Sequence, residues 1–162
     1  MDKELEKFIF ESLKGQFSWD VCEKNLDFYN RFGKSFPSDL GDYDAFCISL
    51  PKKTIILVEA KNLRTPFMPN EIEREFKFLF YKTENGRRVD YSTKFIKRIK
   101  FVKNNVTQIL ELFGIKSDNK DWKVKNYFVM RNLSYNLFNI PDEFKSIKYI
   151  NLQDFVKEIN LV

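Results

Sequence analysis

The segment Gly41-Asp42-Tyr43-Asp44 is followed, fourteen residues after Asp44, by Val58-Glu59-Ala60-Lys61. An acid therefore lies at the start of one apolar run, and an acid and a lysine lie at the end of the next. Because strand side chains alternate between two faces, Glu59 and Lys61 point the same way. If the two runs pair as neighbouring strands, Asp44, Glu59 and Lys61 converge on one small volume. Such charges are costly to hold together unless they bind a divalent cation and polarise a water.

The run Ile55-Ile56-Leu57-Val58 indicates where the second of these strands lies. It is apolar on both faces, which predicts a central strand that is covered on both sides. Hydrophobic periodicity and the Gly, Pro and Asn breakers predict the other elements. We expect helices at residues 4–13, 70–81, 92–113 and 152–159, and strands at residues 18–28, 43–50, 54–60, 124–130 and 147–150. This order predicts an α/β fold in which a mixed central β-sheet of about five strands is flanked by helices on both faces.

Local signals set the boundaries of the two middle helices. Pro66 and Pro69 break the chain before the first of them, and we expect Asn70 to be its N-cap. Gly114 is expected to end the second helix. Between the two helices, residues 84–88 are predicted to form a polar loop.

The composition limits the classes of protein that this chain can belong to. Its 162 residues are typical of one domain, spanning 1–162, and a hydrophobic content of 43% is enough for a core. The net charge of +5 suits a polyanionic partner without demanding one. The sequence contains no histidine, which excludes Ser-His and Cys-His catalysis and imidazole zinc sites. Any chemistry must therefore use carboxylates, lysine, tyrosine or a hard metal held by oxygen atoms.

Cysteine usage and hydropathy predict where the protein is found. Cys22 and Cys47 are too few for a disulfide framework, and Cys47 lies in an apolar run, so we expect reduced thiols with Cys47 buried. The N-terminus is charged and lacks the apolar core of a signal peptide. No stretch approaches the ~20 apolar residues that span a bilayer. These features predict a soluble, cytoplasmic protein.

The residues around the two acids resemble the PD-(D/E)xK phosphodiesterase superfamily, whose members share the restriction-endonuclease-like fold. The resemblance rests on Gly41-Asp42-Tyr43-Asp44, on the apolar strand that follows it, and on Glu59-Ala60-Lys61-Asn62. It covers most of the chain, from about Glu4 to Phe155. The eponymous Pro-Asp pair of the family is absent, and the Gly-Asp-Tyr-Asp run stands in its place. In such proteins the nuclease-like module often lies at the end of a longer polypeptide.

The resemblance implies a role for each residue of the pattern. Asp44 and Glu59 would bind Mg²⁺ or Mn²⁺, and the Ala60 carbonyl would supply a further oxygen. Lys61 would orient the attacking water or help to deprotonate it, and it would offset charge in the transition state. Asp42 shares the expected strand face of Asp44 and stays open as an alternative ligand.

An acid on the first helix commonly completes the site in this family. Glu6 is the first choice, because it lies beside the apolar stripe that includes Ile9 and Leu13, and Glu11 is the rival. The alternative for each is an ordinary exposed helix acid.

Lys94, Lys97 and Arg98 lie on the expected basic face of the helix at 92–113. We predict that they contact phosphates, with Lys94 and Arg98 best placed because they are one turn apart. The alternative is that water simply solvates this face.

The resemblance therefore predicts a Mg²⁺- or Mn²⁺-dependent nuclease that hydrolyses phosphodiester bonds and leaves a 5′-phosphate. DNA is expected as its substrate in preference to RNA. Its expected partners are nucleic acid and either a second copy of the chain, as a homodimer, or neighbouring domains of a longer polypeptide. No membrane partner is expected. Two alternatives stay open. One is a module of the same fold that binds nucleic acid without turnover, and the other is an interaction domain whose charged triad is a structural ion network.

Overall fold

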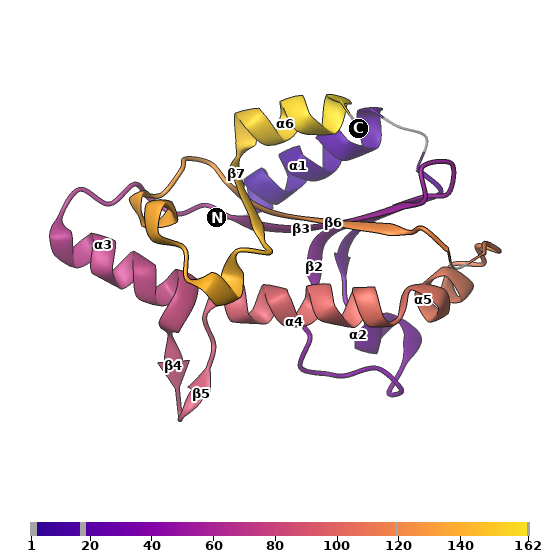
Figure 1. The fold of residues 1–162 in the computed structure, drawn as a ribbon, viewed down its shortest axis with the longest axis horizontal. Coiled ribbons are helices and arrows are strands. Elements are labelled where there is room, and N and C mark those ends of the chain that lie inside the picture. The colour runs from indigo at the N-terminus through magenta and orange to yellow at the C-terminus, as the bar shows by residue number, and fades with distance from the viewer. Residues whose placement is uncertain (1–2, 17–18, 119, 162) are drawn as a thin grey trace.

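The computed structural model describes residues 3–16, 19–118 and 120–161 and has an α/β architecture (Figure 1). The strands are β1 (Val21–Leu26), β2 (Tyr43–Ser49), β3 (Thr54–Lys61), β4 (Thr83–Glu84), β5 (Arg87–Arg88), β6 (Lys123–Met130) and β7 (Lys148–Asn151). The α-helices are α1 (Lys3–Gln16), α2 (Phe28–Phe32), α3 (Pro69–Phe76), α4 (Tyr91–Asn104), α5 (Val106–Leu112) and α6 (Leu152–Leu161). A π-helix, η1 (Lys77–Tyr81), and two 3₁₀-helices, η2 (Tyr135–Asn139) and η3 (Asp142–Phe144), complete the list. Within these ranges, none of the helices has the length and apolar character that a membrane span requires.

The main sheet contains five strands in the order β1-β2-β3-β6-β7. β1, β2 and β3 are antiparallel neighbours, whereas β3, β6 and β7 run parallel. This arrangement confirms the predicted mixed sheet. β3 is its middle strand, and the first seven of its eight residues are buried. The apolar run on both faces of β3 thus has the central, covered position that the sequence predicts.

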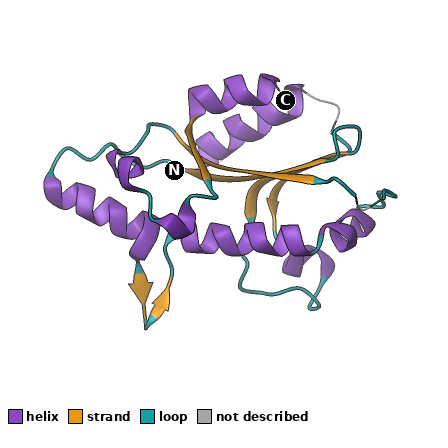
Figure 2. Ribbon diagram, viewed as in Figure 1, coloured by secondary structure: helices purple, strands orange, loops and turns teal. Residues whose placement is uncertain are grey.

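Helices cover both faces of the sheet (Figure 2). α1 and α6 lie on one face, and α4 and α5 lie on the other (Figure 1). Ile56 and Val58 of β3 belong to the core on the α1 side, whereas Ile55 and Leu57 belong to the core on the α4 side. The alternation of one strand therefore divides the apolar interior into two layers.

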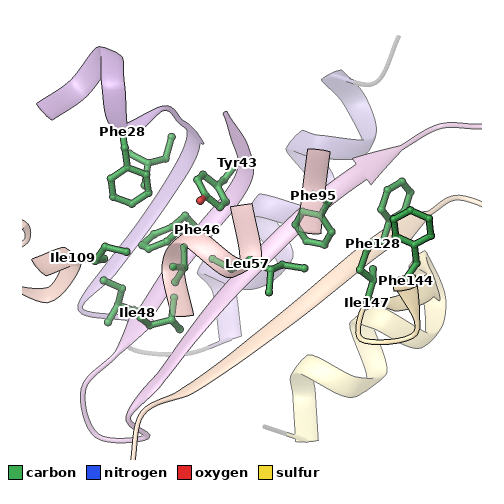
Figure 3. Packing of buried hydrophobic residues seen from close by; sticks show 14 of the residues in the cluster. Phe28, Tyr43, Phe46, Ile48, Leu57, Phe95, Ile109, Phe128, Phe144 and Ile147 are labelled. Atoms are coloured by element: carbon green, nitrogen blue, oxygen red, sulfur yellow. The ribbon is translucent and has the colours of Figure 1, made fainter. Parts of the chain in front are cut away.

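The layer on the α4 side is rich in aromatic rings (Figure 3). Phe28 packs edge to face against Tyr43 and Phe46, with ring centroids 5.7 and 5.6 Å apart. Tyr43 and Phe46 form a third such pair at 5.6 Å. Each edge-to-face pair contributes about 0.5–1.5 kcal/mol beyond the burial of its area. These rings fix the strand that carries Asp44 against α2 and α4.

The strand predicted at 18–28 is shorter than expected, because its end turns into α2. Asp27 is the N-cap of this helix and accepts a hydrogen bond from the Asn30 N–H. Aspartate is among the residues that favour this cap position, so the Asp27 signal decides in favour of a helix. Ser18, the first residue of the predicted strand, lies outside the described residues.

The helix predicted at 70–81 differs from the expectation at both ends. Its N-cap is Met68 rather than Asn70, and Pro69 occupies the first turn. Proline suits that position because its missing N–H would have no helical partner there. The C-terminal part, η1, is wound as a π-helix.

The polar loop predicted at 84–88 is a hairpin formed by β4 and β5. Asn85 and Gly86 turn the chain with φ values of 49° and 73°. Both angles lie in the left-handed region, and the Asn-Gly pair is typical of two-residue hairpin turns. The Asn-Gly pair was visible in the sequence, but the flanking strands are too short to show the alternation of apolar and polar residues that predicts a strand.

The helix predicted at 92–113 is broken at Asn105, which ends α4 and begins α5. The Asn105 side chain donates a hydrogen bond to the Phe101 carbonyl at 2.7 Å. Such local bonds compete with helix continuation. The apolar spacing continues across the break, so periodicity alone predicted one helix.

Cys22 and Cys47 face each other across β1 and β2, with their Sγ atoms 2.6 Å apart. Both are free cysteines, and Cys47 is buried, as predicted. The pair lies in the layer on the α1 side. Burial is the main cause that raises the pKa of the Cys47 thiol, which keeps that group protonated.

Phe46→Ala tests the aromatic layer. Phe46 has no exposed surface, so the substitution should lower the free energy of unfolding by about 3–5 kcal/mol through lost contacts and a residual cavity. Urea unfolding monitored by circular dichroism measures the change. Phe138→Ala is the matched control, because Phe138 is 85% exposed and its removal should change stability by less than about 0.5 kcal/mol. Equal effects of the two substitutions would contradict this packing.

Candidate active site

Asp44 lies where β2 and β3 stop pairing. The last pair of their register at this end is Ala45 with Val58. Beyond that pair, Asp44 Oδ2 accepts a hydrogen bond from the Ala60 N–H at 2.6 Å. A carboxylate thus takes the place of a backbone carbonyl as the acceptor. The β2–β3 ladder therefore ends on a buried acid.

An irregularity in β1 and β2 turns Asp44 toward this position. The register of the two strands omits Asn25 and Asp44, and Asn25 has a φ of 53°. Asparagine tolerates this left-handed conformation better than most residues. On β2, Tyr43 and Phe46 pack in the same core layer, although strict alternation would place them on opposite faces. The alternation therefore resets at Asp44.

Glu59 is held between two cations. Its Oε1 lies 2.9 Å from Lys61 Nζ, and its Oε2 lies 2.6 Å from Arg98 Nη1. Lys61 Nζ is also 3.8 Å from Asp44 Oδ2. Only 4% of the Glu59 side chain and 6% of the Arg98 side chain are exposed. The structure thus brings the three residues of the predicted pattern together and adds a buried arginine.

The prediction that Arg98 lies on an exposed basic face is wrong. The guanidinium is buried, and besides Glu59 it donates a hydrogen bond to the Asp42 carbonyl. In return, the Tyr43 hydroxyl donates to the Arg98 carbonyl at 3.1 Å. Arg98 is three residues after Phe95 and four before Val102, which is the spacing of the buried stripe of α4. That spacing was the signal for burial, and the positive charge concealed it.

Asp42 has a different role from Asp44. Its side chain is exposed, and it precedes β2. Its contribution to the Arg98 network is the backbone carbonyl. Of the two, Asp44 is the acid that lies beside Lys61, whereas Asp42 lines the cleft that opens beside Glu59 and Asp44 does not, so Asp42 stays open as an alternative ligand.

The pKa of Asp44 is raised to about 7. Burial is the main cause, and the negative charge of Glu59 adds to it. Lys61 and the hydrogen bond from Ala60 act in the opposite direction. Near neutral pH, Asp44 is consequently divided between its protonated and ionised forms.

Glu6 of α1 is the upstream acid nearest to this group. Its charge is a weak further cause of the raised pKa of Asp44, which places Glu6 within electrostatic range. Glu6 is half-buried, whereas Glu11 is exposed. The structure therefore favours Glu6 over Glu11. In the part of the chain that the structure describes, no hydrogen bond joins Glu6 to Asp44.

A cleft of about 350 Å³ opens beside these residues. Glu59, Lys61 and Arg98 form its inner wall, and the exposed Lys94 lies on its rim. Lys97 is exposed as well, but it pairs with Asp39 at 3.5 Å rather than lining the cleft. Of the three predicted phosphate contacts, Lys94 is thus the one that faces the cleft from an exposed position.

The donor atoms fit a hard divalent cation. Mg²⁺ is typically bound by one or two carboxylates and completes its shell with waters and phosphate oxygens. Asp44 and Glu59 are two such carboxylates. The Ala60 carbonyl points in the direction of its own N–H, toward Asp44, because both groups of a strand residue face the same neighbour. The described residues include no cluster of three His, Cys, Asp or Glu side chains that could hold a metal, so the set is two acids and a carbonyl.

Comparison with known proteins gives no match to this chain, whether among family models, curated proteins or solved structures. The assignment of a function therefore rests on the geometry of the site.

The raised pKa of Asp44 predicts how stability depends on pH. Between about pH 4 and about pH 7 the folded protein holds a proton that the unfolded chain has lost, so stability falls as pH rises through this window. Asp44→Asn should remove this contribution. Relative to the variant, wild-type protein should lose about 3 kcal/mol between about pH 4.5 and about pH 7.5. Urea unfolding in EDTA measures the difference, and Asp39→Asn, an exposed acid of the cleft rim, is the control. A difference that does not change with pH would contradict the expectation.

Arg98→Met tests the buried ion pair. The substitution leaves the buried Glu59 carboxylate with one cation, and it should cost about 3–5 kcal/mol of unfolding free energy. Arg31→Met is the matched control, because the Arg31–Glu23 pair is partly exposed and should contribute at most about 1 kcal/mol. Combining Arg98→Met with Glu59→Met should recover stability relative to Arg98→Met alone. A loss below about 1 kcal/mol for Arg98→Met would show that the pair is not needed.

Proposed function

We propose that this protein is a metal-dependent nuclease that hydrolyses phosphodiester bonds, and that DNA rather than RNA is its substrate. One observation carries the proposal. Asp44, Glu59 and Lys61 converge at the end of the central strand pair, and the cleft beside them is open to solvent. Buried charges persist mainly when they are paired or bind a metal.

The residues can divide the work of hydrolysis. Bound Mg²⁺ or Mn²⁺ would supply a polarised phosphate and a water of lowered pKa. Asp44 and Glu59 would hold the cation, and Lys61 places an ammonium beside both of them, where it would stabilise charge on the phosphate oxygens. The water oxygen bonds to phosphorus, the bond to the 3′ oxygen breaks, and a proton ends on that oxygen. The product carries a 5′-phosphate.

Arg98 acts on this site through Glu59. Its buried guanidinium donates a hydrogen bond to the Glu59 carboxylate and orients the Oε2 atom. We therefore assign Arg98 as a positioning residue. Lys94, on the rim of the cleft, is the residue best placed to meet the phosphate backbone of the substrate.

A second candidate function is a module that binds nucleic acid without cleaving it. The observation in its favour is that both oxygens of Glu59 already have cationic partners. A metal ion would have to share one of these oxygens with Lys61 or Arg98, or displace one of them. If this exchange is unfavourable, the site stays a structural ion network, and the basic rim still attracts a polyanion.

Glu59→Gln and Lys61→Met test the proposed nuclease. With Mg²⁺ or Mn²⁺, wild-type protein should nick supercoiled plasmid, and each variant should be slower by about 100-fold or more because one charge of the site is lost. EDTA should abolish the activity, and added Mn²⁺ should restore it. Electrophoresis of the plasmid and of end-labelled oligonucleotides measures the rates.

Glu73→Gln and Lys77→Met are the matched controls. This pair joins the same two chemical groups at 2.6 Å, but it is exposed on the surface. Both controls should cleave as fast as wild-type protein. Activity that survives Glu59→Gln and Lys61→Met would refute this site, and binding of DNA without cleavage by wild-type protein would favour the second candidate.

A further inference from the structure

A second cavity adjoins the candidate active site at the end of β3. Its volume is about 750 Å³, compared with about 350 Å³ for the cleft. Asn62, which lines it, directly follows Lys61. Arg131, on another wall, directly follows Met130, the β6 partner of Lys61. A chain-like ligand can therefore occupy both hollows and pass Lys61 between them.

The cavity is lined by three exposed arginines, Arg64, Arg74 and Arg131. They come from three segments: the chain after β3, helix α3 and the chain after β6. In the described part of the protein, the arginines that form an ion pair with an acid are Arg31, Arg88 and Arg98. The three arginines of the cavity are outside this set, and Arg74 is within electrostatic range of Glu71, an acid of the cavity wall. Their guanidinium groups match the geometry of a phosphate.

The two acids of the cavity wall are committed to the protein itself. Glu71 Oε2 accepts hydrogen bonds from the Phe67 and Met68 N–H groups, at 2.9 and 3.2 Å. Glu75 is buried, and its Oε2 accepts hydrogen bonds from Ser134 Oγ at 2.7 Å and from Asn136 Nδ2 at 2.9 Å. These bonds use the carboxylates to fix α3 and its N-terminus, so the arginines determine what the cavity attracts.

Two aromatic rings complete the lining. Phe67 is 86% exposed, so its ring faces are open to a ligand. Phe78 of η1 is half-buried, and its ring stacks against Tyr91 with Lys82 Nζ 4.7 Å from its centroid. Phe67 is therefore the ring that offers open faces. Arginines beside an open aromatic ring are a combination that holds single-stranded nucleic acid, because every base can stack on the ring. The bases of a duplex are already stacked and paired, so they cannot offer their faces in this way.

We propose that this cavity binds a single-stranded segment of nucleic acid that flanks the phosphate held at Lys61. Arg64, Arg74 and Arg131 contact its phosphates, and Phe67 stacks on a base. The proposal rests on the proposed function for the position of the scissile phosphate, but binding in the cavity can be measured without cleavage. The cavity volume lies within the range of about 300–1,000 Å³ that is typical of ligand pockets and admits a nucleotide.

Fluorescence anisotropy with a labelled oligothymidine in EDTA tests the cavity. Arg64→Gln, Arg74→Gln and Arg131→Gln should each weaken binding by roughly 3- to 10-fold, and each should reduce the slope of log affinity against log salt by about 0.7. Phe67→Ala should weaken binding by roughly 5- to 100-fold with the salt slope unchanged. The matched controls are Arg87→Gln and Phe138→Ala, which remove an exposed arginine and an exposed ring outside the cavity. The four substituted side chains that are not controls line one cavity. A loss of affinity in all four variants would therefore locate the oligonucleotide in that cavity.

The outcomes separate the two proposals. Lys61→Met should abolish cleavage, and its affinity for the oligonucleotide should fall no further than that of a single arginine variant, because one phosphate contact is lost. Cavity variants that bind like wild-type protein, or a blunt duplex that binds more tightly than the single strand, would overturn the cavity proposal and leave the nuclease proposal intact. A third outcome combines two results: the cavity variants lose binding, and wild-type protein cleaves nothing with Mn²⁺. It would support the cavity proposal and overturn the nuclease proposal.

Discussion

The charge of Glu59 must be neutralised inside the protein, and much of the molecule is arranged to do so. Removing a carboxylate from water costs several kcal/mol, which ion pairs recover only when their geometry is good. Lys61 on the same strand and Arg98 on α4 each take one oxygen. The Arg98 bond joins the central strand to the helix that covers it. The interaction thus sets the distance between the sheet and α4 as well as the charge of the site.

The position of Asp44 depends on the same region of the sheet. The omitted pair in the β1–β2 register, with Asn25 in a left-handed conformation, lets Asp44 reach the Ala60 N–H. In a regular strand, Tyr43 and Ala45 would share one face of the sheet, and Asp44 would point to the other. Local irregularities of this kind often occur at functional sites, because they aim a side chain that regular geometry cannot.

The central strand, the mixed sheet and the shared face of Glu59 and Lys61 could be predicted from the sequence, because these features follow from a two-residue period and one unusually apolar run. Asp44 was expected to join them because its strand neighbours theirs, but the irregularity that aims its side chain was not predicted. The burial of Arg98 could not. Its partner lies 39 residues away, so no local pattern indicates that its charge is neutralised. The break at Asn105 was missed for a related reason, since a side-chain bond to the Phe101 carbonyl leaves the apolar spacing unchanged.

The bonds that join Glu75 to Ser134 and Asn136 have a consequence for recognition. They connect helix α3 to a segment 59 to 61 residues further along the chain, which begins two residues after Asn132 of the arginine-lined cavity. The walls are thereby preorganised, and the entropy of arranging them is lost during folding rather than during association. A ligand that enters such a receptacle keeps more of its gross interaction energy as affinity.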